Sequence, residues 1–519
     1  MTVIPSPLHA HTGATALALD AIAPHGFDDA AVEQVSRWAQ VHADGVPIVL
    51  RRPQRDPAAA AAELPAMHPS GVPVDERHRI RVDATGIVVE AATDAGAFRA
   101  MTTIAHSAAV GTVAHGTIED APRFGWRGLS LDVARTPMPI EGIRAIVEIL
   151  ASLKLNVLHL HLTDDQGWRL PIEGHPELTE VGGPMAMAGR PGFAYGAAEY
   201  IELEAWARDR HVWIVPEIDM PGHVGALLAA RPDLAAGSGT PGEYASRLHL
   251  DPDDDAVYEL LADVLEATSR LHASPYLHIG GDEAFGMDDA AYAGFLQRLI
   301  DRLGLDRSRL IAWQEAARGG AGIETLQVWR DLDREGLETD PEARRRLGLL
   351  AAADLDVLTR RGREDVARIS VEGRGVILSP LLVAYLDRPY ADRAAETAGL
   401  SGIGLPIYLP RTVRQSFEFA IETVVPGLDP AAVRGVEAAL WTETIADAET
   451  AERMLLPRLA GIAQRSWEHE PATWDDHAAR LRAVADIWDR RGFRHLRSEL
   501  VHGAQQQPDC PADKSEERP

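Results

Sequence analysis

The chain has 519 residues, an apolar fraction of 46% and a charged fraction of 25%, a composition typical of globular proteins with sizeable cores. Its formal net charge of -27 repels phosphate backbones and anionic headgroups, so neither nucleic acid nor a membrane surface is expected as a partner. The single cysteine, Cys510, excludes an intramolecular disulfide and a cysteine-based zinc cluster. Residues 1–10 lack the features of a signal peptide, so a cytoplasmic location is expected, with secretion by another route left open.

Residues 1–121 are predicted to form a small α/β accessory domain. Apolar residues at helical spacing predict a helix over Val32–Val41. The short apolar run Val46–Arg51 predicts a strand, and an Ala/Pro-rich loop follows it.

A hairpin is predicted next in this domain. His78–Val82 alternates polar and apolar residues, as a half-buried strand does. The turn residues 83–86 separate it from a second predicted strand, Ile87–Ala91. Asp94 is expected to cap a helix that begins near Ala95.

From Phe124 onward, apolar runs alternate with amphipathic helices, and residues 122–503 are predicted to form one domain. The eight runs are Leu129–Val133, Val157–Leu162, Val212–Val215, Tyr276–Ile279, Leu310–Trp313, Leu326–Trp329, Val376–Leu378 and Val436–Leu440. Continuous apolar strands alternating with helices indicate a parallel sheet covered on both faces, and eight of them indicate a (β/α)8 TIM barrel. A doubly wound sheet is the alternative, but no G-x-G-x-x-G fingerprint follows the first run. Residues 331–374 are expected to carry an inserted helix or two, and residues 504–519 to form a disordered tail.

The residues after each run are mostly carboxylates and tryptophans, with one or two arginines. In a barrel of this kind, such residues lie together at the C-terminal ends of the strands. Each type has a simpler explanation when taken alone, because an Asp pair often caps a helix and a single Trp often belongs to a core. Their conjunction at every strand end indicates a sugar site, where carboxylates bind hydroxyl groups and indoles pack on C–H faces.

Five segments in chain order resemble glycoside hydrolase family 20, the β-N-acetylhexosaminidases. They are Arg127–Arg135, Leu158–Trp168, Val215–His223, the His-Ile-Gly-Gly-Asp-Glu stretch at 278–283 and Leu440–Glu443. The N-terminal portion is similar to the small accessory domain of that family. The resemblance implies exo-acting, retaining hydrolysis of a terminal β-linked N-acetylglucosamine or N-acetylgalactosamine, with no cofactor and no metal.

The resemblance also implies substrate-assisted catalysis, in which the 2-acetamido oxygen of the sugar attacks its own anomeric carbon and forms an oxazolinium intermediate. Glu283 is then the general acid and later the base, Asp282 orients the acetamido group, and Tyr385 hydrogen-bonds its oxygen. The implied substrate-binding residues are Trp313, Trp329 and Trp441 as pocket walls, Arg135, Asp387 and Glu443 on sugar hydroxyls, and the pair Asp164 and His223, which tunes Glu283.

One segment departs from the family pattern. The family usually has a further Trp before the eighth strand, near the sugar-binding rim, and residues 398–408 contain none. Tyr408 is the candidate replacement, and the departure concerns the leaving-group subsite. The expected partner is a small sugar or oligosaccharide with a terminal N-acetylhexosamine; the oligomeric state is not predicted.

Three alternatives remain beside this interpretation. A family relative with an altered substrate, such as a lacto-N-biosidase-like or sulfated-sugar enzyme, has the same motifs. A metal-dependent amidohydrolase uses a His-x-His pair, and His159 and His161 have that spacing, although on the second strand instead of the first. A non-catalytic sugar-binding protein on this fold is expected to lack Glu283 or Tyr385, and both are present.

Overall fold

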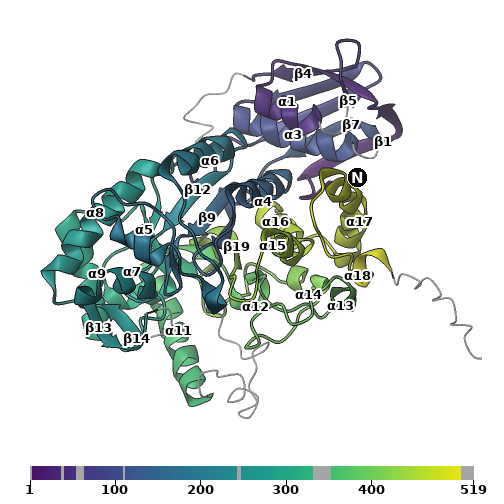
Figure 1. Ribbon diagram of the computed structural model, residues 1–519. Helices are drawn as coiled ribbons and strands as arrows, with labels where there is room; N and C mark the ends of the chain where they lie inside the picture. Colours follow the sequence, from purple (N-terminus) through teal and green to yellow (C-terminus); the bar gives the residue numbers. More distant parts are fainter. Residues whose placement is uncertain are drawn as a thin grey trace, which may run out of the picture.

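The structure is a computed structural model that describes residues 3–36, 40–53, 63–108, 111–241, 247–330 and 352–503. A sheet covered by helices packs beside a closed parallel barrel wrapped in helices (Figure 1). This is the predicted architecture, and the predicted fold class is confirmed. The predicted tail, 504–519, and residues 331–351 of the predicted insertion lie outside the described residues. Across the described ranges, no helix is both long and apolar enough to cross a membrane.

The N-terminal sheet has the strand order β1-β7-β5-β6-β4-β2-β3. Its strands are β1 His9–Ala18, β2 Ala21–His25, β3 Gln40–Val41, β4 Val46–Arg51, β5 His78–Asp83, β6 Gly86–Ala91 and β7 Thr112–Asp120. Helix α3 (Asp94–Ala108) packs on β5, β6 and β7, and α1 (Asp29–Ser36) packs on α3. The strand β4 and the antiparallel hairpin β5–β6 lie where the sequence predicted them.

Two predictions in this unit are wrong in detail. Helix α1 ends at Ser36, and Gln40–Val41 forms the strand β3 instead of a last helical turn, because its backbone pairs with β2; Trp38 and Ala39 lie outside the described residues. Thr93, not Asp94, caps α3, since its Oγ1 accepts the N–H of Gly96 at 3.1 Å.

Every predicted apolar run forms one strand of the barrel, which closes in the order β8-β9-β12-β15-β16-β17-β18-β19. The strands are β8 Trp126–Asp132, β9 Val157–His161, β12 Trp213–Glu217, β15 Leu277–His278, β16 Leu310–Trp313, β17 Thr325–Val328, β18 Gly375–Leu378 and β19 Val433–Leu440. All neighbouring pairs are parallel, and β19 pairs with β8 to close the ring. Strands covered on both faces exclude water from both sides, which is why they appear in the sequence as continuous apolar runs.

Helices and short hairpins connect these strands, and α15 to α18 follow the last one. The longer helices are α4 Ile140–Ser152, α6 Ala197–Asp209, α8 Asp255–Leu271, α9 Asp289–Leu303, α11 Ala352–Glu372, α16 Arg458–Trp467 and α17 Trp474–Arg491. The shorter ones are α5 Glu177–Gly182, α7 Gly225–Ala230, α12 Leu381–Ala384, α13 Ala394–Thr397, α14 Val413–Phe417, α15 Ala448–Leu455 and α18 Glu499–His502. The hairpin strands are β10 Thr163–Asp164, β11 Gly167–Trp168, β13 Ala235–Ser238 and β14 Arg247–Leu250. Helix α11 is a helix of the predicted insertion.

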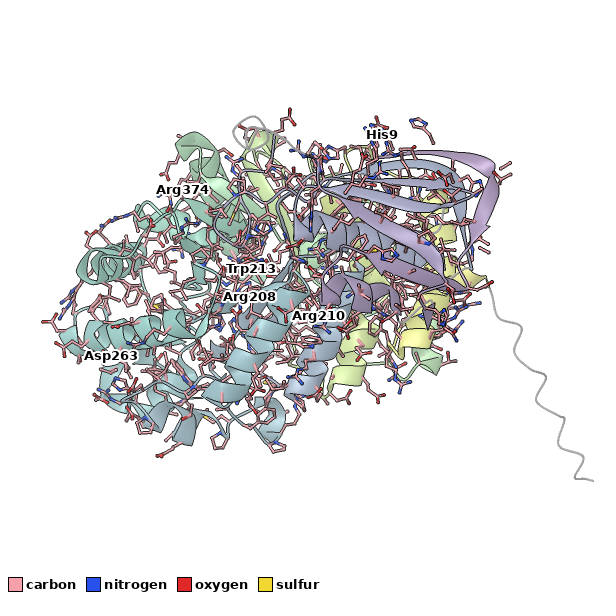
Figure 2. The ribbon with its side chains drawn as sticks, turned by 90° about the horizontal axis from the view of Figure 1, so that it is seen from above. His9, Arg208, Arg210, Trp213, Asp263 and Arg374 are labelled. Atoms are coloured by element: carbon pink, nitrogen blue, oxygen red, sulfur yellow. The ribbon has the colours of Figure 1, made fainter. Side chains whose placement is uncertain are left out.

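Ion pairs join the N-terminal unit to the barrel, and those made by Glu76 are buried. The carboxylate of Glu76 accepts hydrogen bonds from Arg99 of α3 at 2.8 Å and from Arg127 of β8 at 2.9 Å. Arg210, which follows α6, reaches Glu33 of α1 at 2.9 Å and is labelled in Figure 2. The floor of the barrel is a separate apolar cluster of Met67, Trp126, Val157, Val215, Tyr276, Ile311 and Ile377. Met67 comes from the N-terminal portion, so that portion contributes to the barrel's own packing.

Candidate active site

The carboxyl ends of the barrel strands carry the predicted site residues to one rim, because parallel strands all end on the same side. Arg135 follows β8, Asp164 lies in β10 after β9, His223 follows β12, and Asp282 and Glu283 follow β15. The remaining strands contribute Trp313 (β16), Trp329 (β17), Tyr385 and Asp387 (β18), and Trp441 and Glu443 (β19). Contacts between these residues link them into one site.

The turn after β15 is tight and holds its backbone in a rare conformation. Gly280 and Gly281 have φ of 63° and 102°, and Glu283 has φ of 45°. A side chain at Gly280 is excluded by space as well, because its Cβ would lie 1.7 Å from Oδ1 of Asp219. That same Oδ1 accepts the N–H of Gly281 at 2.9 Å. A non-glycine residue in the left-handed region is a feature of functional sites, where the fold maintains the strain.

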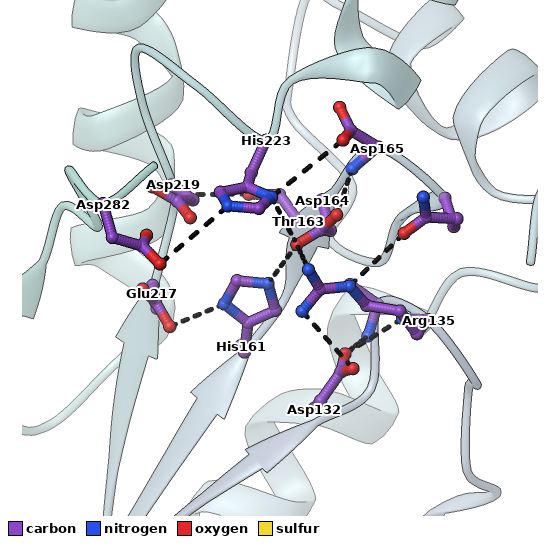
Figure 3. A network of polar contacts seen from close by, with 12 residues as sticks. Asp132, Arg135, His161, Thr163, Asp164, Asp165, Glu217, Asp219, His223 and Asp282 are labelled. Atoms are coloured by element: carbon purple, nitrogen blue, oxygen red, sulfur yellow. Dashed lines mark hydrogen bonds and ion pairs between the residues drawn. The ribbon is translucent and has the colours of Figure 1, made fainter. Parts of the chain in front are cut away.

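One carboxylate oxygen, Oδ2 of Asp164, faces three cationic groups (Figure 3). Arg135 Nη2 lies 2.7 Å away, His161 Nε2 2.8 Å and His223 Nδ1 3.4 Å. Burial favours the neutral acid, but Arg135 and His223 hold the pKa of Asp164 far below its usual range. Asp164 is therefore a fixed negative charge that orients both the arginine and the histidine.

His223 bridges this charge to the turn after β15. Its Nε2 lies 3.9 Å from Oδ2 of Asp282 and 4.0 Å from Oε2 of Glu283. Burial opposes the charged ring, yet Asp164 and Asp282 raise the pKa of His223 well above its usual value. Burial raises the pKa of Asp282 to about 7, against the opposing effect of His223. The protonated ring thus stands beside both members of the predicted catalytic pair.

An aromatic cluster lies next to this charged group. Trp329 stacks on Tyr385 with ring centroids 6.1 Å apart and planes inclined by 10°. Trp441 lies 6.0 Å from Tyr385 and 6.0 Å from Trp313. Tyr408 meets Tyr385 edge-on at 6.3 Å and is buried, so it belongs to this cluster. The four predicted aromatic residues thus form one apolar surface, with Tyr408 beside it.

Asp387 and Glu443 are buried carboxyl groups with hydrogen-bonding capacity to spare. Neither oxygen of Asp387, nor Oε2 of Glu443, has a hydrogen-bond partner among the described residues. Burial, and then the charge of Glu443, raises the pKa of Asp387 to about 8. Burial also raises the pKa of Glu443 to about 7, against the opposing charge of Arg135. Burying an acceptor without a hydrogen-bond partner costs free energy, so these oxygens indicate a polar ligand that donates hydrogen bonds to them.

The sequence profile of the glycosyl hydrolase family 20 catalytic domain matches residues 124–470, and that of the family's domain 2 matches residues 1–121. The chain belongs to glycosyl hydrolase family 20. It is 35% identical to a β-N-acetylhexosaminidase of Cellulomonas fimi over 438 residues, which covers 81% of this chain and 80% of the relative. It is 28% identical to a β-hexosaminidase of Porphyromonas gingivalis, of which it spans 51%. A solved β-hexosaminidase mutant of Streptomyces plicatus, in complex with its product GlcNAc, matches with a TM-score of 0.79 and 30% identity over 96% of this chain and 97% of that one.

This family 20 site includes two residues for which the sequence suggested no role. Arg330, after β17, places Nη2 3.0 Å from Oε1 of Glu283 and Nη1 3.6 Å from Oε1 of Glu315. Glu315 accepts the indole N–H of Trp329 at 3.2 Å. Both residues stand near predicted strand ends, but nothing in their spacing shows that they meet Glu283 and Trp329 across the rim.

The His-x-His pair of β9 lies inside the family 20 barrel, below the rim. His159 lies between Glu217 and Glu437, and His161 between Glu217 and Asp164. Burial opposes their charge, but Glu217 leads the groups that raise the pKa of His159 to about 9 and the pKa of His161 well above its usual value. A metal ligand must be a neutral imidazole, so these contacts favour a hydrogen-bonded ion-pair role over an amidohydrolase metal centre.

Proposed function

We propose that this enzyme releases terminal β-linked N-acetylhexosamine, with N-acetylglucosamine as its principal substrate, and that the substrate's own acetamido group is the nucleophile. Family membership supports hydrolysis of a glycosidic bond. The product named for the Streptomyces plicatus relative, GlcNAc, supports the choice of sugar. The residues at the rim supply the groups that the reaction needs.

In the first step, the acetamido oxygen forms a bond to the anomeric carbon while the glycosidic bond breaks. Glu283 gives its proton to the departing oxygen, and Asp282 accepts the acetamido N–H and balances the positive charge of the oxazolinium ion. In the second step, the Glu283 carboxylate takes a proton from water, and that water attacks the anomeric carbon. The oxazolinium ring opens, and two inversions give net retention.

The other rim residues hold the sugar in this scheme. Tyr385 donates a hydrogen bond to the acetamido oxygen, and the indoles of Trp313, Trp329 and Trp441 enclose the acetamido methyl group. Arg135, Asp387 and Glu443 bind ring hydroxyls, and the charged pair Asp164 and His223 holds the environment of Glu283. An intramolecular nucleophile gains a large effective concentration only when such a pocket fixes its geometry.

The observation that carries this proposal is the position of Asp282, which stands between Glu283 and the aromatic surface that contains Tyr385. Oδ1 of Asp282 is buried and has no hydrogen-bond partner in the described part of the chain, while Glu283 is the next residue. The Asp282 charge also acts on Tyr385, whose pKa is raised well above its usual value by burial first, and then by Tyr408 and Asp282. A carboxylate placed between the proton donor and an aromatic surface is better placed to accept a hydrogen bond from the acetamido N–H than to attack the anomeric carbon of the sugar.

Hydrolysis of chromogenic β-GlcNAc and β-GalNAc glycosides tests the activity. We expect the unmodified enzyme to cleave them and Glu283→Gln to lose most of the rate on a poor leaving group. A dinitrophenyl glycoside needs little acid assistance in the first step, so its bond cleavage should survive better in that variant. Glu202→Gln, on an exposed face of α6, makes the same chemical change away from the site and serves as the control.

A thiazoline analogue of the oxazolinium ion tests the mechanism. We expect competitive inhibition of the unmodified enzyme and weaker inhibition of Asp282→Asn. If the unmodified enzyme cleaves neither glycoside, the proposed activity is overturned. Cleavage without thiazoline inhibition overturns the acetamido nucleophile and indicates a carboxylate nucleophile instead.

A further inference from the structure

The barrel interior below the site holds ionisable side chains where branched apolar residues usually dominate. Glu217, the last residue of β12, is fully buried and is contacted from β9, β15 and β16. Its Oε2 lies 2.7 Å from Nδ1 of His161 and 3.0 Å from Nε2 of His159. Its Oε1 accepts the indole N–H of Trp313 at 2.7 Å and lies 3.2 Å from Nδ1 of His278.

The histidines of β9 keep this carboxylate ionised. Burial alone would raise the pKa of Glu217, but the facing histidines, His161 first among them, hold it well below its usual range. Each ring of β9 also faces a second carboxylate. His159 Nδ1 lies 2.9 Å from Glu437. His161 Nε2 lies 2.8 Å from Asp164, a contact drawn in Figure 3. Because both nitrogens of each ring face an acceptor, the imidazolium form fits here. Glu217 is thus a charged acceptor for Trp313, and such hydrogen bonds are the stronger kind.

Trp313 is held at two points, and the second leads to the catalytic turn. Its side chain donates to Glu217, and its backbone N–H donates to the carbonyl of Gly280 at 2.9 Å. Gly280 opens the turn that carries Asp282 and Glu283. The contact with Glu217 therefore fixes the angle of the indole relative to Asp282.

We propose that Glu217 is a positioning residue that orients Trp313, and through Trp313 the 2-acetamido group, for attack on the anomeric carbon. This role rests on the proposed function, since an acetamido group needs such alignment only when it is the nucleophile. Glu217 touches neither the sugar nor Glu283 in this scheme. Its effect is nevertheless large, because a misplacement of about 1 Å costs on the order of 100-fold in rate.

The test compares two carboxylates of the same core. Glu217→Gln keeps the shape and removes the charge that holds the indole. Glu437→Gln makes the same change on β19, where Glu437 is equally buried and binds His159, Trp126 and Gln327 but is not among the partners of the Trp313 indole. We expect Glu217→Gln to weaken thiazoline inhibition and lower kcat by on the order of 10- to 100-fold. Glu437→Gln should lower the melting temperature and leave the thiazoline inhibition constant within about threefold.

Trp313→Phe provides a second route should Glu217→Gln not fold, because it removes the donor of this hydrogen bond, together with one ring of the indole, and keeps an aromatic side chain. We expect it to weaken thiazoline inhibition as Glu217→Gln does, and the double variant to lose little more than either single one. Equal effects of Glu217→Gln and Glu437→Gln, additive effects in the double variant, or unchanged inhibition of Trp313→Phe would each overturn the role of Glu217. The unmodified enzyme separates the two proposals: if it is not inhibited by the thiazoline, the proposed mechanism itself has failed.

Discussion

The guanidinium of Arg330 lies against the carboxylate of Glu283, with Nη2 3.0 Å from Oε1, and packs over the ring of Trp329 at 4.3 Å from its centroid. Arg330 therefore holds one oxygen of the Glu283 carboxyl group while it packs on Trp329, so it couples the orientation of Glu283 to that of the indole.

Replacement of Arg330 by Gln should therefore lower the rate, because Glu283 loses the guanidinium that holds one of its oxygens. We expect kcat/KM to fall by on the order of 10- to 100-fold in Arg330→Gln, and by less in Arg330→Lys, which keeps a donor but lacks the flat guanidinium. Initial rates on a chromogenic β-GlcNAc glycoside measure the loss. An unchanged kcat/KM in Arg330→Gln would contradict the orienting contact.

Gly280→Ala should inactivate the enzyme and destabilise it. The new Cβ would meet Asp219, whereas the matched variant Gly304→Ala adds a methyl group at the same φ of 63° with no described atom within 4 Å. Both variants carry the cost of a left-handed residue, about 1–2 kcal/mol, and only Gly280→Ala adds an overpacking cost of about 1–3 kcal/mol. Urea unfolding of both variants separates the two costs, and equal losses would contradict the predicted clash.

Binding of GlcNAc should release protons near neutral pH. Asp387 and Glu443, with pKa values raised to about 8 and about 7, are partly protonated in the free site, and sugar hydroxyls that donate to them favour the ionised forms. Affinity for GlcNAc should then rise from pH 6 to pH 8, by at most about tenfold per pH unit for each proton released. Calorimetry in two buffers of different ionisation enthalpy counts the protons, and Asp387→Asn should weaken binding and flatten the pH dependence. Proton uptake on binding would contradict the assignment.

The fold was readable from the sequence because each barrel strand is buried on both faces and so forms an unbroken apolar run. Local residue patterns gave the wrong prediction at two places in the N-terminal unit, where backbone pairing or a neighbouring hydroxyl determined the structure. Val41 continues a helical spacing, yet its backbone pairs with β2. Asp94 is a good capping residue, but it is already the first residue of α3. Thr93, one position before it, caps the helix, because its hydroxyl accepts the N–H of Gly96.

The site was predictable at the level of which residues reach the rim, since strand order fixes the rim. The contacts across the barrel were not. Arg330 meets Glu283 from β17, and Glu217 meets Trp313 from β12, and no spacing along the chain encodes either contact. Such pairs depend on side-chain direction in the closed ring.

Acid should destabilise the fold through histidines that are buried without charge. Burial lowers the pKa of His106 to about 3, whereas the unfolded chain binds its proton near pH 6.5, so unfolding takes up a proton between those values. Stability should therefore fall as pH drops below 6.5, by about 1.4 kcal/mol per pH unit from this residue. His106→Gln should make the decline between pH 6 and 4.5 shallower in urea titrations, while the exposed His11→Gln should not. An unchanged slope in His106→Gln would show that other groups dominate.

Met67 and Glu76 tie the stability of the barrel to the N-terminal portion of the chain. The side chain of Met67 packs in the apolar cluster at the barrel floor, and Glu76 neutralises Arg127 at the start of the first barrel strand. A barrel excised after residue 121 would lose Met67 from that cluster and retain a buried arginine without its counter-ion. Domain exchange between relatives would therefore have to keep the segment around Met67 and Glu76 together with the barrel.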